Sequence, residues 1–401
     1  MKVKLTTFLI WMYFFNMIVV PNGTAFSRIL KILFVGLAGL YIILNRYRTK
    51  WYGHFNWLIL FTAISAASIL WATSRDFAMR GAGTIALNSI CVIMLGLVLL
   101  CANDWIGVTV PCLCILPIIF FARLFILHGT AVLGGLRNVE GGMHNTVGVY
   151  SGFGMSFCIY YIMDRGRKNK NVTARWIVLC AINTLICVVS MSRKIIVYLF
   201  LPLFLGVLLS GENYTKRIRN LLTIALGTTV VYFALMNIPV LYNYIGKGIE
   251  KVITYLTRGT GDASAAGRNT RIQYGLLMFS RKPWFGYGAM NYNYLFYNFE
   301  SLTQMIVADN NFVDIAVNSG IVGLAAYYSI YLKYTFLYLK KGKHDTFVHV
   351  FPFAILLTLL ITDYGVSAYL YQHSQTYLMI ATLMIFQQTE VSSLRKETNL
   401  V

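Results

Sequence analysis

Cationic and carboxylate side chains gather in the C-terminal half of this sequence. Arg268 and Arg271 are three residues apart, a spacing that a helix places on neighbouring turns of one side. Asp309 stands where a later apolar stretch begins. An arginine fork can bind two oxygens of a phosphate, and a carboxylate within hydrogen-bond reach can take a proton from a hydroxyl. The residue types therefore predict a site for an anionic substrate with a proton acceptor beside it.

A polar stripe follows Asp309 along the same apolar stretch. Asn310, Asp314 and Asn318 fall at i, i+4 and i+8, so a helix would place them on one face. Polar groups at membrane depth are costly, and we expect this face to meet a cavity or another helix rather than lipid. Asp309 could also serve as an ordinary N-cap, which would not exclude a chemical role.

Further candidates come from two segments earlier in the chain. We expect Arg137, Arg193 and Lys194 to join Arg268 and Arg271 in binding the anion, and His144 is a second candidate base, with Asn145 in support. Each group has a plainer alternative. His144 and Asn145 could cap a helix, Arg193 and Lys194 could reach lipid phosphates, and Arg268 and Arg271 could sit on a solvated amphipathic helix.

The elements that must position these residues are membrane helices. The 401 residues are 58% hydrophobic and 12% charged, about half the charge of a soluble chain. We expect an all-α polytopic membrane protein, one integral domain over residues 1–401 with about twelve spans. The predicted spans are 5–20, 28–44, 54–72, 84–101, 107–128, 145–163, 176–191, 194–210, 220–241, 309–332, 346–362 and 365–387. The first could be misread as a signal peptide, and we favour an uncleaved anchor.

Basic residues set the expected orientation. With both termini in the cytoplasm, the inner loops carry most Lys and Arg clusters, as the positive-inside rule requires. Residues 242–306 then form a large external loop between spans nine and ten. Much of the +20 net charge is thus an orientation signal and does not indicate nucleic acid. No cysteine lies in the large loop and no His/Cys cluster has zinc spacing, so we expect no disulfide framework, metal or other cofactor.

At these residues the chain resembles the O-antigen ligase and O-antigen polymerase family. The family's late motif, His-Asn followed by Glu-x-Gly-x-x-Gly, matches at Asn310, Gly320 and Gly323, with Asp309 in place of His and Asn318 in place of Glu. The other matching positions are Asn145, Ser192, Arg193, Arg271, Pro283, Gly286 and Gly288. The resemblance implies a glycosyltransferase whose donor is a glycan on a polyprenyl diphosphate, such as undecaprenyl diphosphate.

From the resemblance we expect a polymerase that joins lipid-linked repeat units of O-antigen (the lipopolysaccharide polysaccharide), capsule or a related surface polysaccharide. It would act on the outer face of a bacterial inner membrane, with membrane lipids and possible partners in a chain-length regulator and a flippase. Two alternatives stay open: a ligase that transfers glycan to lipid A-core or protein, and a non-enzymatic flippase of the same lipid. The missing His favours the polymerase. Arginines would stabilise the leaving diphosphate without a metal, and Asp309, then His144, would be the base.

Overall fold

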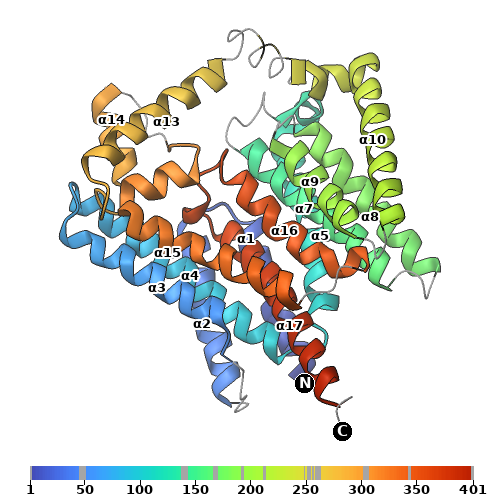
Figure 1. The fold of residues 1–401 in the computed structure, drawn as a ribbon, viewed down its shortest axis with the longest axis horizontal. Helices are drawn as coiled ribbons and strands as arrows, with labels where there is room; N and C mark the ends of the chain where they lie inside the picture. Colours follow the sequence, from blue (N-terminus) through green and yellow to red (C-terminus); the bar gives the residue numbers. More distant parts are fainter. Residues whose placement is uncertain are drawn as a thin grey trace. The chain divides into compact units, whose positions relative to one another are not determined.

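The protein is helical throughout the part of the chain that its computed structural model describes (Figure 1). The described residues are 2–44, 51–136, 143–165, 170–190, 194–210, 214–247, 263–300, 307–341 and 345–398, with isolated positions between 249 and 257. The helices are α1 (Lys2–Ile18), α2 (Ala25–Leu44), α3 (Gly53–Ala67), η1 (Ser68–Leu70), α4 (Arg75–Cys101), α5 (Trp105–His128), η2 (Gly129–Gly134), α7 (Met143–Arg165), α8 (Lys170–Val189), α9 (Lys194–Leu209), α10 (Tyr214–Asn237), α11 (Pro239–Leu241), η4 (Tyr242–Gly246), α13 (Ala263–Arg281), α14 (Asn291–Glu300), α15 (Asn311–Lys341), α16 (Phe347–Thr362), η5 (Ala368–Leu370) and α17 (Gln372–Thr398).

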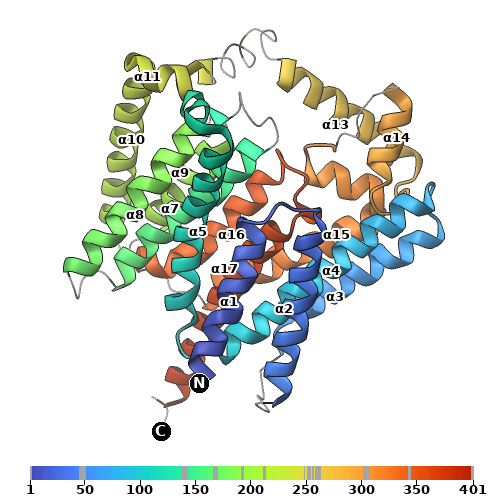
Figure 2. The ribbon, with the colours of Figure 1, turned by 180° about the vertical axis from the view of Figure 1, so that it is seen from behind.

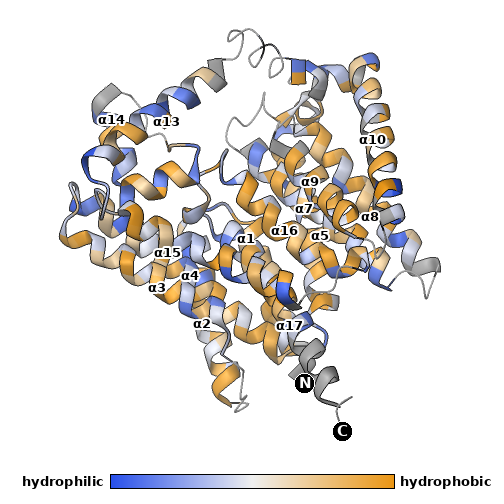
Figure 3. Ribbon diagram, viewed as in Figure 1, coloured by the Kyte–Doolittle hydropathy of each residue, from blue (hydrophilic) through white to orange (hydrophobic). Residues whose placement is uncertain are grey.

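Seven of the described helices are long and apolar enough to cross a membrane. They are Ala25–Leu44, Gly53–Leu70, Arg75–Cys101, Trp105–Leu133, Asn145–Arg165, Ile218–Asn237 and Asn311–Lys340. Shorter apolar helices cover Leu5–Ile18, Thr173–Val189, Phe200–Leu209 and Phe347–Thr362. Apolar residues run along most helices, whereas α13 is largely hydrophilic (Figure 3). The chain is an integral membrane protein of the all-α class, while the expected number of twelve spans stays a prediction.

The chain forms two compact units, each built from three separate stretches of sequence. Unit 1 comprises Met1–Leu30, Ala102–Gly261 and Gly342–Thr358, and unit 2 comprises Lys31–Cys101, Asp262–Lys341 and Leu359–Val401. In unit 1, α7 packs against α5, α8 and α9 (Figure 2). The Tyr150 hydroxyl of α7 donates to the Met17 carbonyl at 2.8 Å, which ties α1 to this group of helices.

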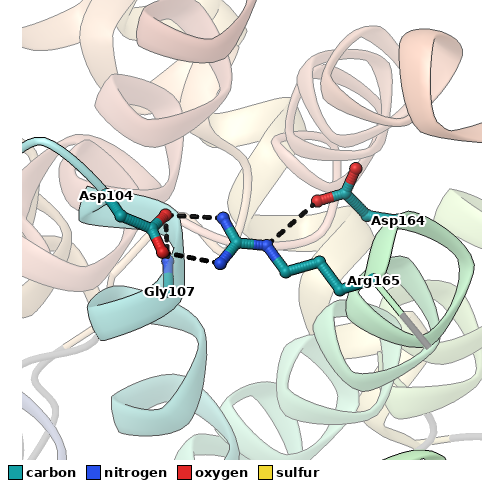
Figure 4. A network of polar contacts seen from close by, with 4 residues as sticks. All are labelled: Asp104, Gly107, Asp164 and Arg165. Atoms are coloured by element: carbon teal, nitrogen blue, oxygen red, sulfur yellow. Dashed lines mark hydrogen bonds and ion pairs between the residues drawn. The ribbon is translucent and has the colours of Figure 1, made fainter. Parts of the chain in front are cut away.

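An ion pair joins the beginning of α5 to the end of α7 in unit 1 (Figure 4). Both terminal nitrogens of Arg165 contact Asp104, with Nη1 2.6 Å from Oδ2 and Nη2 2.5 Å from Oδ1. Asp104 also accepts from the Gly107 amide and so caps α5, and Asp164 contacts Arg165 from the other side. The Arg165 guanidinium holds the pKa of the Asp104 carboxyl below its usual range. Both ends were predicted to lie on one side of the membrane, as this contact requires.

Unit 2 places α3 beside α4 and α15. The Trp57 indole of α3 donates to the Ala326 carbonyl of α15 at 2.9 Å. The Asn88 amide of α4 donates to the Leu370 carbonyl at 3.0 Å. The last predicted span was expected to begin at residue 365, but α17 begins at Gln372, and the preceding turn and η5 pack against these helices instead.

α15 is not one straight helix. Gly320 has φ 65° and ψ −166°, which lies outside the helical region and which an L side chain rarely adopts. The Asn311 amide nevertheless lies 3.2 Å from the Tyr328 hydroxyl, and the Phe312 and Tyr328 rings stack at 4.5 Å. A continuous helix would separate positions 311 and 328 by about 25 Å. The first arm therefore folds back along the second, so residues 309–332 do not form the one straight helix that the sequence predicted.

The segment 283–288 occupies the break in α15. The Tyr287 and Gly288 amides donate to the carbonyls of residues 317 and 318 at 2.9 and 2.8 Å. The amides of Ile321 and Val322 donate in turn to the carbonyls of residues 283 and 284 at 2.8 and 3.3 Å. A break in a membrane helix is tolerated where other groups satisfy the freed backbone. The 283–288 segment and the residues around Gly320, which belong to two motifs distant in sequence, thus bond directly to each other.

Candidate functional site

The candidate site lies where α13 meets the first arm of α15, within unit 2. Gly275 allows the close approach, since a Cβ there would stand 2.2 Å from Cγ1 of Val313. Four residues earlier in each segment, Arg271 of α13 faces Asp309, which lies just before α15. Met278, Tyr292, Ala308 and Val317 are buried around this contact and hold the two segments together.

Arg271 and Asp309 form an ion pair, with Nη2 3.0 Å from Oδ2. Their side chains keep 16% and 25% of their surface exposed, so the pair is half-buried and still open to a ligand. Nε of Arg271 donates to the Gly267 carbonyl at 3.2 Å, and the Tyr292 hydroxyl donates to the Arg271 carbonyl at 2.9 Å. These bonds fix the position of the guanidinium. The structure therefore brings a predicted anion ligand and the predicted base into direct contact.

Asp309 does not cap α15. The helix begins at Asn311, and the Asn310 side chain accepts from the Val313 amide at 3.0 Å. Asp309 itself has φ 52°, a left-handed conformation that costs a non-glycine residue about 1 kcal/mol. Such strain persists only where neighbouring structure imposes it. The capping alternative for Asp309 is thus wrong, and Asn310 is the N-cap of α15.

Arg268 lies one turn before Arg271 on α13 and is half-buried. Its Nε is buried without a hydrogen-bond partner among the described residues. A buried donor without an acceptor costs about 1–3 kcal/mol, and more where the group is charged. Arg268 thus has a donor available for an anion close to the ion pair along the helix.

The predicted polar stripe faces protein, as expected. Asp314 and Asn318 are fully buried, and the Asn318 amide donates to Asp314 at 2.6 Å and to the Tyr369 hydroxyl at 2.9 Å. The Asn318 side-chain oxygen accepts from the Tyr292 amide at 2.7 Å, near the beginning of α14. Asn318 thus organises the helix break, and the 0% exposure of Asp314 keeps its carboxyl out of reach of a substrate.

Sequence reasoning missed three residues beside this site. Asp363 follows α16 and is buried, and its Oδ2 accepts from the Asn311 amide and from the Tyr328 hydroxyl, both at 3.0 Å. Asp363 could have been found in the sequence, because it is a carboxylate between two apolar stretches. Asn311 and Tyr328 could not, because only the fold-back of α15 brings them together.

The remaining predicted site residues belong to the stretches that form unit 1. Arg137 and Arg193 lie outside the described residues, as do the side chains of His144 and Lys194. Asn145 lies inside α7 and is half-buried. Their part in the site stays a prediction. Among the described residues, no group of three or more His, Cys, Asp or Glu side chains is arranged to hold a metal ion.

Comparison with protein-family models gives a match in the C-terminal half and centre of the chain. A family model described as O-antigen ligase matches residues 176–328, which include α13, its contact with Asp309 and the break at Gly320. No curated protein matches the chain. The matched segment holds most of the motif positions on which the resemblance was based, from Ser192 to Gly323, whereas Asn145 lies outside it. The match supports the resemblance to the O-antigen ligase and O-antigen polymerase family.

Proposed function

We propose that this protein is a glycosyltransferase that polymerises oligosaccharide repeat units carried on a polyprenyl diphosphate. The observation that carries the proposal is the ion pair between Arg271 and Asp309, with the unpartnered Nε of Arg268 one turn away. A cation that binds the leaving diphosphate and a carboxylate that receives the acceptor proton must lie close together, because both act around one anomeric carbon.

In the proposed reaction, the acceptor sugar hydroxyl attacks the anomeric carbon of the donor. The bond from that carbon to the diphosphate oxygen breaks, and the lipid diphosphate leaves with the bonding electrons. Arg271 and Arg268 stabilise the charge that grows on it. Asp309 takes the hydroxyl proton. The diphosphate replaces Asp309 as the partner of Arg271, which releases the carboxylate to act as the base. Arg137, Arg193 and Lys194 belong to the same proposed diphosphate site.

A ligase is the second candidate, and the description of the matching family model favours it. It would use the same donor chemistry with lipid A-core or protein as the acceptor. Asp309 in place of the family's His is the residue on which we base the polymerase assignment. A flippase is less favoured, because it should line a path through the spans with charge, whereas the predicted site gathers its cations on the outer face. The inner-membrane location, the outward-facing site and the partners expected from the sequence are parts of this proposal.

The glycan on the carrier lipid in a deletion strain tests the assignment. A strain without this protein should accumulate single repeat units on polyprenyl diphosphate if the protein polymerises them. Long chains left on the carrier would identify a ligase instead. Unchanged carrier-linked glycan outside the cytoplasm would exclude both enzymes, and its retention on the inner face would indicate a flippase.

A further inference from the structure

A buried carboxylate near the site has no part in the proposed chemistry. Asp363 is 2% exposed, and its backbone carbonyl accepts from the Asn311 amide at 2.7 Å in addition to the two bonds to its side chain. The Asn311 side-chain oxygen accepts from the Tyr369 amide at 2.9 Å. Asn311 is thereby held at its backbone and at both ends of its side chain.

This network reaches Asp309 through two peptide bonds. On one side of Asp309, Ala308 is fully buried among apolar residues, and on the other Asn311 is bonded to Asp363. Asp309 is held between these two points with φ 52°. The left-handed backbone, imposed from both sides, directs its carboxylate toward Arg271.

We propose that Asp363, acting through Asn311 and Tyr328, is a positioning residue that sets the place of the Asp309 carboxylate. The inference rests on the proposed function, since it concerns the residue assigned there as the base. Asp363 does not touch the reacting atoms in this scheme. It holds the beginning of the first arm of α15 against the second arm, so that the Asp309 carboxylate contacts Arg271.

The network needs a hydrogen-bond acceptor at position 363 rather than a charge. Both side-chain donors, Asn311 Nδ2 and the Tyr328 hydroxyl, bond to one oxygen, and the amide oxygen of Asn can accept both. Burial raises the pKa of Asp363 to about 7, so a neutral side chain suits this environment. If Asp363 is a positioning residue, Asp363→Asn should keep its activity. If Asp363 is a second proton acceptor, the same variant should lose activity.

The test is repeat-unit polymerisation by purified full-length variants in detergent, with kcat and donor KM measured separately. Asp363→Asn should stay within a few-fold of wild type, whereas Asp363→Ala should lose about 10- to 100-fold in kcat. Tyr328→Phe removes one donor but keeps the ring on Phe312, and should lose less. Thr382→Val, a buried hydrogen-bonding position elsewhere in unit 2, is the matched control and should keep full kcat.

The same changes are then made in an Asp309→Asn background. If Asp363 acts through Asp309, Asp363→Ala and Tyr328→Phe should change the residual rate by less than about twofold. A further loss of kcat in the Asp309→Asn background as large as that in the wild-type background would overturn the inference. The inference would also fail if Asp363→Asn lost as much kcat as Asp363→Ala. Should Asp363→Ala fail to fold, Tyr328→Phe in the two backgrounds decides. Full activity of Asp309→Asn would instead remove the base from the proposed function.

Discussion

At the scale of single residues, the ion pair between Asp309 and Arg271 occupies both groups that the proposed reaction needs. A carboxylate oxygen that bonds to Arg271 is not free to bond to a sugar hydroxyl, and the same guanidinium nitrogen is not free to bind a phosphate oxygen. Arrival of the donor diphosphate resolves both, because the anion takes over the arginine. In the proposed reaction, the 3.0 Å contact makes Asp309 a competitor of the donor diphosphate as well as the base.

Asp309→Asn should therefore lower kcat by about 10²–10⁴-fold, the contribution of general base catalysis. The donor KM should not rise, because the competing charge on Arg271 is removed. Asp309→His should keep more activity than Asn, since imidazole has a pKa near neutrality. Steady-state rates of purified variants test this. A near-normal rate for Asn would move the search for the base to His144.

Arg268→Ala and Arg271→Ala should each abolish chain extension while the protein remains in the membrane, and so should Arg193→Ala. Lys should restore little at each position, because its point charge lacks the two-pronged geometry. Arg281→Ala, at the exposed end of the same helix as Arg271, is the control and should be almost silent. Full chain extension by all three alanine variants would refute the diphosphate assignment.

At the scale of elements, the fold-back of α15 creates the site. Without the break at Gly320, Asn311 would stand about 25 Å from Tyr328. The two residues could not then bond to the same Asp363 carboxylate. The segment 283–288 replaces the hydrogen bonds that the break removes. α13 ends just before this segment. The hydrogen bonds that pair the free backbone groups at the break therefore also position α13, and with it Arg271, against the first arm.

Gly320→Ala should destabilise the protein severely. A Cβ at this position would lie 2.2 Å from the Trp284 carbonyl oxygen, and the left-handed φ adds about 1–2 kcal/mol. We expect a clearly lower thermal midpoint in detergent, or loss of the folded protein from the membrane. Gly83→Ala in α4, where a Cβ would meet no atom within 4 Å, should not lower the midpoint, because alanine favours a helix more than glycine does. Equal midpoints for the two variants would show that the break does not need glycine.

At the scale of the whole molecule, the contacts within each unit agree with the sidedness predicted from charge. The Asp104–Arg165 pair joins two segments expected inside the cytoplasm. The Ser74 amide donates to Asn291 at 2.7 Å, which joins two segments expected outside. Shared sides follow from these contacts, while the direction of the whole chain across the membrane depends on the basic loops.

Single cysteines in a cysteine-free background test that direction. An impermeant thiol reagent applied to intact spheroplasts should label position 264, at the beginning of α13, and should not label position 171. Position 104 should behave as 171 does, because the short link between α4 and α5 that holds it lies near Arg165 in the structure. Labelling at 171 with protection at 264 would place the candidate site in the cytoplasm and end the proposed function.

Sequence alone determined the class of this protein and most of its helices. Apolar length and the positive-inside bias act locally along the chain, so they need no knowledge of which helices touch. The same holds for the spacing of Arg268 and Arg271, and for a polar stripe that had to avoid lipid. The ordered motifs were also readable, and the family match over residues 176–328 agrees with them.

Only the tertiary structure decided how these parts meet. A left-handed glycine inside an apolar stretch leaves no periodic signal, so the stretch over 309–332 had the pattern of a single span. The pairing of Arg271 with Asp309 depends on the close approach at Gly275, and the role proposed for Asp363 depends on the fold-back of α15. Contacts between segments distant in sequence arise from packing and backbone conformation, which hydropathy and charge along the chain do not encode.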